Sequence, residues 1–153
     1  MRDVTSIHKL CVEDNKITYI ANGIVQDRVL NQFSMDESDG YFGVATTSGW
    51  SSSATSNVYI LNQQLSIIGK LEGLAQGESI CSARFMGERC YLVTFQKVDP
   101  LFVIDLKDSQ KPKVLGKLKM PGYSNYLEPY DDTHLIGIGK ETIDAEQEYF
   151  SWY

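Results

Sequence analysis

The sequence predicts an all-β fold, and three observations support this prediction. Short runs rich in Val, Ile, Leu, Phe and Tyr are separated by Gly, Pro and Asp, as in strands that are joined by hairpins. Helical periodicity is weak along the whole chain, and the nine tyrosines suit β-sheet. A group of four strands recurs about every 40–50 residues, which is the repeat length typical of β-propeller blades.

The segment Ser82–Met120 shows the four-strand unit most clearly. We predict strands at residues 82–86, 90–95, 101–106 and 114–120, with turns of Gly, Asp and Pro between them. The third strand begins with four apolar residues in a row, so both of its faces should be buried. The fourth strand alternates lysines with apolar residues, as expected of an outer strand with one face in water.

Two copies of the tripeptide Gly-Lys-Leu give the sharpest internal match. They begin at Gly69 and Gly116, 47 residues apart, and each lies in a predicted fourth strand. Two further alignments accompany this match: Ser56–Leu61 with Pro100–Asp105, and Phe33 with Phe85. A non-repeating β-sandwich that shares turn chemistry by chance is the alternative. We favour the propeller because the order of the strands repeats together with the residues.

The repeat divides the chain into two complete blades flanked by two half blades. We place a half blade at residues 7–26, complete blades at 31–73 and 82–120, and a partial blade at 124–153. The first segment is a hairpin around Asp14-Asn15 in the place of third and fourth strands. The last supplies first and second strands, and Tyr149–Tyr153 is predicted to begin a third. The chain is thus a partial β-propeller of about three blades, whereas a closed propeller has about four to eight.

The two half blades are complementary, because one lacks the strands that the other supplies. Bare sheet edges pair readily with other chains. We therefore expect a homo-oligomer through the exposed blade edges, in which two copies supply six blades.

Composition and charge exclude several classes of partner. The chain has 153 residues, of which 42% are hydrophobic and 22% charged, so it should fold around a real core. Its net charge of −6 argues against nucleic acid and against an anionic membrane surface. No apolar run is long enough for membrane insertion, and the first ten residues lack the apolar region of a signal peptide.

The cysteines and histidines do not form a metal-binding pattern. There is no C-x-x-C pair, and the chain has only His8 and His134, so we expect no zinc site and no other cofactor. Cys81 and Cys90 flank one predicted hairpin, where buried thiols are favoured over a disulfide. The third cysteine is Cys11.

Acidic residues cluster at two corresponding turns. The candidates for a Ca²⁺ site are Asp36 and Asp39 at one turn and Asp131 and Asp132 at the other. Neither turn matches the D-x-[DN]-x-[DN]-G loop, and Asp is common in hairpin turns because it hydrogen-bonds to the local backbone. We favour the structural interpretation over calcium.

Two further features have both a structural and a functional interpretation. Trp50, in a predicted long loop at 47–56, either folds back over the blade rim or contacts a partner. Three aspartates, Asp99, Asp105 and Asp108, bracket the third strand of the 82–120 blade. We expect Asp105 to accept hydrogen bonds from the turn backbone, whereas paired carboxylates for glycoside hydrolysis are the catalytic alternative.

Several strings, among them NQFSMDESDGYFGVATT, SARFMGERCYLVTFQKVDPLFVIDL and PKVLGKLKMPGYSNYLEPYDDTHLIGIG, together with the tail KETIDAEQEYFSWY, resemble a family of bacterial and archaeal secreted or surface proteins with a C-terminal β-propeller domain. The resemblance covers nearly the whole chain from about Thr5. It implies a β-propeller and an extracellular or cell-surface location of the parent protein, and it implies no catalytic residues.

Two functions follow as expectations. The first is a non-catalytic interaction or scaffold module that presents its loops to a protein or glycan partner. The second is a hydrolase of glycan or peptide whose active site needs further blades. A central pocket with two carboxylates about 5–10 Å apart would favour the hydrolase.

Overall fold

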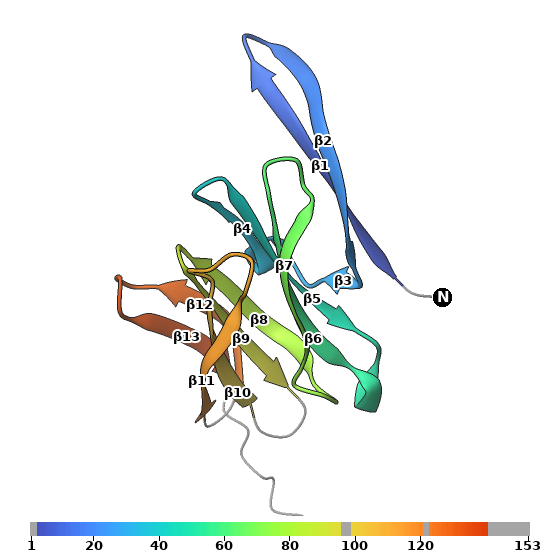
Figure 1. The fold of residues 1–153 in the computed structure, drawn as a ribbon. Helices are drawn as coiled ribbons and strands as arrows, with labels where there is room; N and C mark the ends of the chain where they lie inside the picture. The colour runs from blue at the N-terminus through green and yellow to red at the C-terminus, as the bar shows by residue number, and fades with distance from the viewer. Residues whose placement is uncertain (1–2, 96–98, 121–122, 141–153) are drawn as a thin grey trace, which may run out of the picture.

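The computed structural model describes residues 3–95, 99–120 and 123–140 (Figure 1). They form antiparallel strands and two short 3₁₀ turns, and no α-helix occurs among them. No helix in these ranges could cross a membrane. The elements are, in order, β1 Val4–Glu13, β2 Lys16–Gln26, β3 Arg28–Val29, η1 Gln32–Ser34, β4 Met35–Ser38, β5 Tyr41–Ser48, η2 Ser51–Ser53, β6 Thr55–Leu61, β7 Ile67–Leu74, β8 Ser79–Met86, β9 Arg89–Phe95, β10 Asp99–Asp105, β11 Lys113–Met120, β12 Tyr123–Pro129 and β13 Leu135–Lys140.

The strands form two complete sheets and two separate hairpins. The order β8-β9-β10-β11 makes one sheet, and β5-β6-β7 with β3 and β4 on the free side of β5 makes the other. We call the sheet of β3–β7 blade 1 and the sheet of β8–β11 blade 2. The hairpins β1–β2 and β12–β13 lie at separate ends of the molecule in Figure 1. This arrangement confirms the predicted partial β-propeller.

A bulge at the same place in both blades fixes how they correspond. In blade 1 Ile60 pairs with Gly69 and Leu61 with Ile67, and in blade 2 Val103 pairs with Gly116 and Ile104 with Val114. Each fourth strand therefore carries one extra residue directly before its glycine. The predicted equivalence of the two glycines is confirmed.

The same pairing corrects the predicted alignment of the third strands. Leu61, not Ile60, occupies the place of Ile104, so the alignment of Ser56–Leu61 with Pro100–Asp105 was wrong by one residue. A slip of one residue exchanges the two faces of a strand. The run is apolar on both faces, so its sequence pattern does not set the register.

The innermost strand of blade 1 is also different from the prediction. It is split into β3 and β4 by the turn η1, and Phe33 lies in that turn. Ser38 pairs with Tyr41 next to the hairpin turn as Met86 pairs with Arg89, which puts Glu37 at the place of Phe85. The alignment of Phe33 with Phe85 was therefore wrong.

Bulges also show which strands the hairpins correspond to. In β1–β2 the shift falls between Lys9, opposite Ala21, and Leu10, opposite Tyr19. Ala21 therefore takes the place that Gly69 and Gly116 have in the fourth strands of the two blades. In β12–β13 the shift follows Ser124, as it follows Ile80 in β8–β9. The first hairpin thus corresponds to third and fourth strands, and the second to first and second strands.

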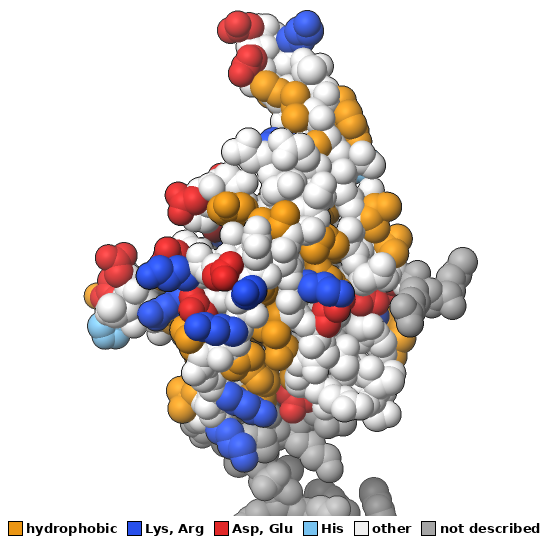
Figure 2. All heavy atoms as spheres, viewed as in Figure 1, with side chains coloured by type: hydrophobic (Ala, Val, Ile, Leu, Met, Phe, Trp, Pro, Cys, Tyr) orange, Lys and Arg blue, Asp and Glu red, His pale blue; other side chains and the backbone are white. Residues whose placement is uncertain are grey.

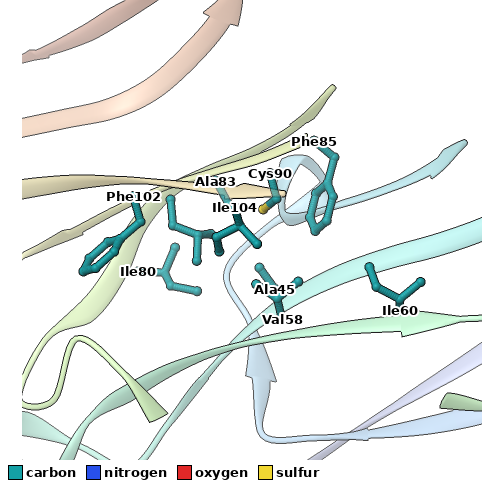
Figure 3. Close-up of a cluster of buried hydrophobic side chains, with 10 residues drawn as sticks. Ala45, Val58, Ile60, Ile80, Ala83, Phe85, Cys90, Phe102 and Ile104 are labelled. Carbon is teal, nitrogen blue, oxygen red and sulfur yellow. The ribbon is translucent and has the colours of Figure 1, made fainter. Parts of the chain in front are cut away.

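The main core lies between the two blades. Buried side chains of β8, β9 and β10 point toward those of β5 and β6 (Figure 3): Ala45, Val58 and Ile60 on one side, and Ile80, Ala83, Phe85, Cys90, Leu92, Phe102 and Ile104 on the other. Burying one large apolar side chain contributes about 1.5–3 kcal/mol. Two smaller clusters join blade 1 to β1–β2 and blade 2 to β12–β13.

The structure also tests two local predictions, the long loop at residues 47–56 and the state of the cysteines. The predicted loop at 47–56 is shorter, because β5 continues to Ser48 and β6 begins at Thr55. All three cysteines are free, and Cys90 is fully buried. Its burial raises the pKa of the thiol.

Candidate functional site

The first strands of successive blades contact one another, as they do around the axis of a propeller. The strand β8 contacts both β12 and the segment η1–β4. Residues of these three elements therefore meet where a propeller has its central channel. We call the cluster formed there by Phe33, Asp36, Arg84, Tyr126 and Glu128 the axial cluster.

Three charged residues of the axial cluster occupy the same place in successive first strands. Asp36 pairs with Gly43, Arg84 with Tyr91, and Glu128 with Ile136. Asp36 and Arg84 are at the same distance from the hairpin turn of their blades, and Arg84 and Glu128 are at the same distance from the bulge of their first strands. Acidic, basic and acidic side chains thus follow one another around the axis.

Arg84 lies at the centre of the axial cluster. Its guanidinium carbon is 5.2 Å from the centre of the Phe33 ring and 5.9 Å from that of Tyr126. The two rings meet edge to face, with centres 5.1 Å apart. One guanidinium nitrogen lies 3.8 Å from a carboxylate oxygen of Glu128. Aromatic contacts of this kind hold a guanidinium in place while leaving its N–H groups free.

Glu128 is oriented by a second partner, Tyr126. The Tyr126 hydroxyl donates a hydrogen bond to the Glu128 carboxylate. This bond raises the pKa of Tyr126, which keeps the phenol protonated, and Arg84 acts in the opposite direction. Within the described residues no hydrogen bond fixes the Arg84 guanidinium, so its donors are available to a ligand.

An open groove of about 460 Å³ lies beside Arg84. Its lining combines a cation, a carboxylate, an amide and apolar surface: Gln32, Phe33, Met35, Asp36, Arg84, Phe85 and Pro129. Asp36, which the sequence nominated for calcium, lies here and accepts a hydrogen bond from the Glu37 amide. A few polar groups set in an apolar concavity are typical of a binding site.

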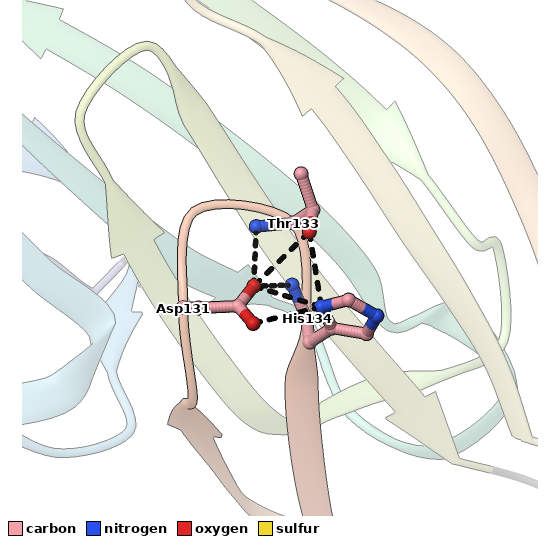
Figure 4. A network of polar contacts seen from close by, with 3 residues as sticks. All are labelled: Asp131, Thr133 and His134. Atoms are coloured by element: carbon pink, nitrogen blue, oxygen red, sulfur yellow. Dashed lines mark hydrogen bonds and ion pairs between the residues drawn. The ribbon is translucent and has the colours of Figure 1, made fainter.

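The other acidic candidates lie in hairpin turns. Asp39 has a φ of 51° and is followed by Gly40 at 78°, a left-handed pair that Asp and Gly adopt readily. Asp131 accepts hydrogen bonds from the amides of Thr133 and His134 and from their side chains (Figure 4). These bonds, with that of the Thr133 amide first, lower the pKa of Asp131. Asp132 is exposed in the same turn.

The described residues contain no group of three or more His, Cys, Asp or Glu side chains placed to hold a metal ion. The four acidic candidates belong to two hairpins, and Asp131 already accepts several local hydrogen bonds. The Asp131 carboxylate thus stabilises the backbone of its own turn.

Trp50 is exposed beside the turn η2 and does not fold back over the rim. Its side chain is 70% exposed, and the Arg28 guanidinium lies 3.6 Å above one face of the ring. Arg28 also donates a hydrogen bond of 2.7 Å to the carbonyl of Gly49. The second face of the indole therefore remains open to a partner.

The aspartates of the third strand of blade 2 stabilise its turn. Asp105 accepts a hydrogen bond from the Lys107 amide, which confirms the predicted backbone role, and it lies 3.8 Å from the Lys113 ammonium. Asp108 accepts from the Gln110 amide. The side chain of Asp99 and the segment Tyr149–Tyr153 lie outside what the structure describes.

Comparison with known proteins places this geometry in a family. The family model of the β-propeller domain matches residues 1–150. The chain belongs to the β-propeller domain family. Members at high identity include an uncharacterized protein of Methanocaldococcus jannaschii, 50% identical over 125 residues, and one of Archaeoglobus fulgidus, 42% identical over 126 residues. These matches cover 80% and 82% of this chain.

The relatives are much longer than this chain. The matched region covers 20% of each of the two archaeal proteins, so the chain spans about a fifth of their length. Both are described as uncharacterized.

Sequence reasoning nominated Asp36 for a different reason and missed the other members of the axial cluster. A signal was present, because Arg84 interrupts an otherwise apolar or small first strand and Glu128 places a residue of opposite charge at the equivalent position one blade later. Reading that signal required the correct register of three first strands. The misplaced alignment of Phe33 obscured it.

Proposed function

We propose that the chain is a non-catalytic interaction module of the β-propeller family that binds an extended peptide in the axial groove. The observation that carries the proposal is the Arg84 guanidinium, which lies over two aromatic rings and is fixed by no hydrogen bond within the described residues. A carboxylate of the ligand would pair with Arg84. A basic side chain two or more residues away would pair with Asp36, which also lines the groove.

A peptide fits the groove better than a glycan. Sugars stack on flat, accessible faces of aromatic rings, whereas Phe33 and Tyr126 meet edge to face and carry Arg84 over them. The remaining lining is amide and apolar, which suits main-chain and aliphatic groups.

Binding of short unstructured peptides that contain both Glu and Lys tests the proposal. We expect saturable amide shifts in NMR spectra, confined to η1, β4, β8 and β12, and weaker binding when Glu is replaced by Gln. Arg84→Gln should weaken binding about 10- to 100-fold, the effect of losing one hydrogen-bonded charge pair. The control Arg89→Gln, at an exposed position of β9, should leave binding unchanged.

Three results would contradict the proposal. Amide shifts of equal size in the unsubstituted chain and in Arg84→Gln would show that the peptide does not bind in the groove. Saturable binding of an acidic oligosaccharide, but of no peptide, would assign the groove to glycans. Cleavage of a bound peptide or glycan that stops on substitution of Glu128 would make the module a hydrolase.

A further inference from the structure

The two hairpins leave sheet edges that match in strand type. Within the described residues β1 pairs only with β2, and β13 pairs only with β12. Their bulges make β1 a third strand and β13 a second strand. In blade 2 the second and third strands, β9 and β10, are direct neighbours in the sheet.

We propose that β13 of one copy pairs with β1 of a second copy, so that the two hairpins form one complete four-stranded blade. Blade 2 supplies the register, because Cys90 pairs with Ile104 and Tyr91 with Val103. Transferred to the hairpins, this register puts Leu135 opposite Leu10 and Ile136 opposite Lys9. We call this sheet the composite blade.

The faces of the composite blade agree with the packing already present. Leu135 lies on the side of β12–β13 that packs against blade 2. Leu10 falls on the same side in the composite blade, while Ile7 falls on the opposite side, where it already packs against blade 1 of its own copy. A register shifted by one residue would turn Leu10 to the wrong side.

The composite blade would also bury apolar surface that is now exposed. The outer face of β1–β2 carries large apolar side chains that are between 54% and 70% exposed: Leu10, Val12, Ile17, Tyr19 and Ile24. The hairpin projects from the rest of the molecule in Figure 1, and apolar side chains lie along it in Figure 2. On blade 2, Leu118 is 60% exposed and pairs with Leu101, on the face that the next blade covers. Exposed apolar areas of this kind mark interaction sites.

Closure of the ring selects two copies. The described residues of each copy form two complete blades and two hairpins, so two copies paired in this way bring six blades together, within the usual range of about four to eight. Three copies would need a ring beyond that range. A head-to-tail contact that closes after two steps gives a symmetric dimer in which the edges of β1 and β13 are both paired.

Solution mass tests the proposal first. Light scattering at high micromolar concentration should give twice the chain mass of 17.2 kDa. Leu10→Asp should give the monomer mass with an unchanged circular dichroism spectrum, because Leu10 is 54% exposed within one copy. Leu30→Asp, at a leucine that is 47% exposed and outside both edges, should remain a dimer. A monomeric unsubstituted chain, or a dimer that survives Leu10→Asp, would overturn the proposal.

A disulfide tests the register. Asp105 pairs with Arg89 in blade 2, and the equivalent residues are Cys11 and His134, which should therefore face each other across two copies. His134→Cys should form a disulfide-linked dimer with the native Cys11 under mild oxidation, since paired strands bring Cα atoms within disulfide range. Lys107→Cys, on an exposed turn, is the control. Equal cross-linking of both variants, or of neither, would overturn the composite blade.

Discussion

The two complete blades have the same strands and the same bulge, but only one has its outer strand covered. A Cβ atom added at Gly69 of β7 would lie 1.9 Å from the carbonyl oxygen of Ser109, in the blade 2 loop that packs on it. A Cβ atom added at Gly116, the equivalent position of β11, would meet nothing within 4 Å. Hydrogen bonding within a blade is thus local, whereas burial depends on the next blade.

A set of three equivalent residues makes the comparison quantitative. The bulges place Leu10, Leu61 and Ile104 at the same position of three third strands. Leu61 and Ile104 are fully buried, and Leu10 is 54% exposed. Because the backbone context is shared, differences in stability between these sites measure the contribution of the neighbouring sheet.

The largest expected effect comes from truncating these three side chains. Leu61→Ala and Ile104→Ala should each lower the free energy of unfolding by about 2–5 kcal/mol, through lost burial and the cavity that remains. Leu10→Ala should cost less than about 1 kcal/mol. Urea unfolding at a concentration where light scattering gives the monomer mass measures all three, and an equal cost at Leu10 would contradict the comparison.

A smaller loss of stability is expected when a methyl group is added at Gly69 than when a buried side chain is truncated. Gly69→Ala should cost about 1–3 kcal/mol, because the new methyl group forces the Ser109 loop away from β7. Gly116→Ala should change stability by no more than about 0.5 kcal/mol. Thermal unfolding of the two variants decides, and a tolerated alanine at Gly69 would show that the loop does not hold the blades together.

The smallest effect concerns the pH dependence of blade 1 alone. Tyr59 donates a hydrogen bond to Glu72, and the Lys70 ammonium lies 2.8 Å from the same carboxylate. The bond with Lys70 lowers the pKa of Glu72 more than that with Tyr59, and burial raises the pKa of Tyr59. The stability due to Glu72 is therefore present above the unfolded pKa of about 4.3 and lost as the pH falls through the folded pKa.

Glu72→Gln should remove this acid dependence and leave stability above about pH 5 lower by at most about 0.5 kcal/mol, as for other exposed ion pairs. Urea titrations between about pH 3 and pH 7 measure it. Glu13→Gln, at an exposed end of β1, controls for the change in net charge. If the free energy of unfolding of Glu72→Gln fell at low pH as it does in the unsubstituted chain, this carboxylate would have no role in the pH dependence.

The repeat was predictable where residue types carry geometry. Gly69 and Gly116 match because each follows a bulge, and the turn at Asp14-Asn15 was predictable because φ is positive at both residues, 47° and 63°. The register of the third strands was not predictable, because Val58–Leu61 is apolar on both faces and gives no signal for register.

The axial cluster was predictable only in part. Asp36 was nominated as one acid of a turn, but its neighbours Arg84 and Glu128 come from two other sheets. Their meeting depends on three first strands in correct register, and on the extra residues of η1 that bring Phe33 to the axis. No pattern within one strand contains that information.

Cross-strand NMR contacts test the central claim, a four-stranded unit that recurs and is buried by its neighbours, most directly. Nuclear Overhauser effects between the α-protons or amides of Ile60 and Gly69, of Val103 and Gly116, and of Lys9 and Ala21 should appear together. On the other side of each bulge, the corresponding pairs are Leu61 with Ile67, Ile104 with Val114, and Leu10 with Tyr19. Gly69 and Gly116 opposite non-equivalent residues would contradict the account.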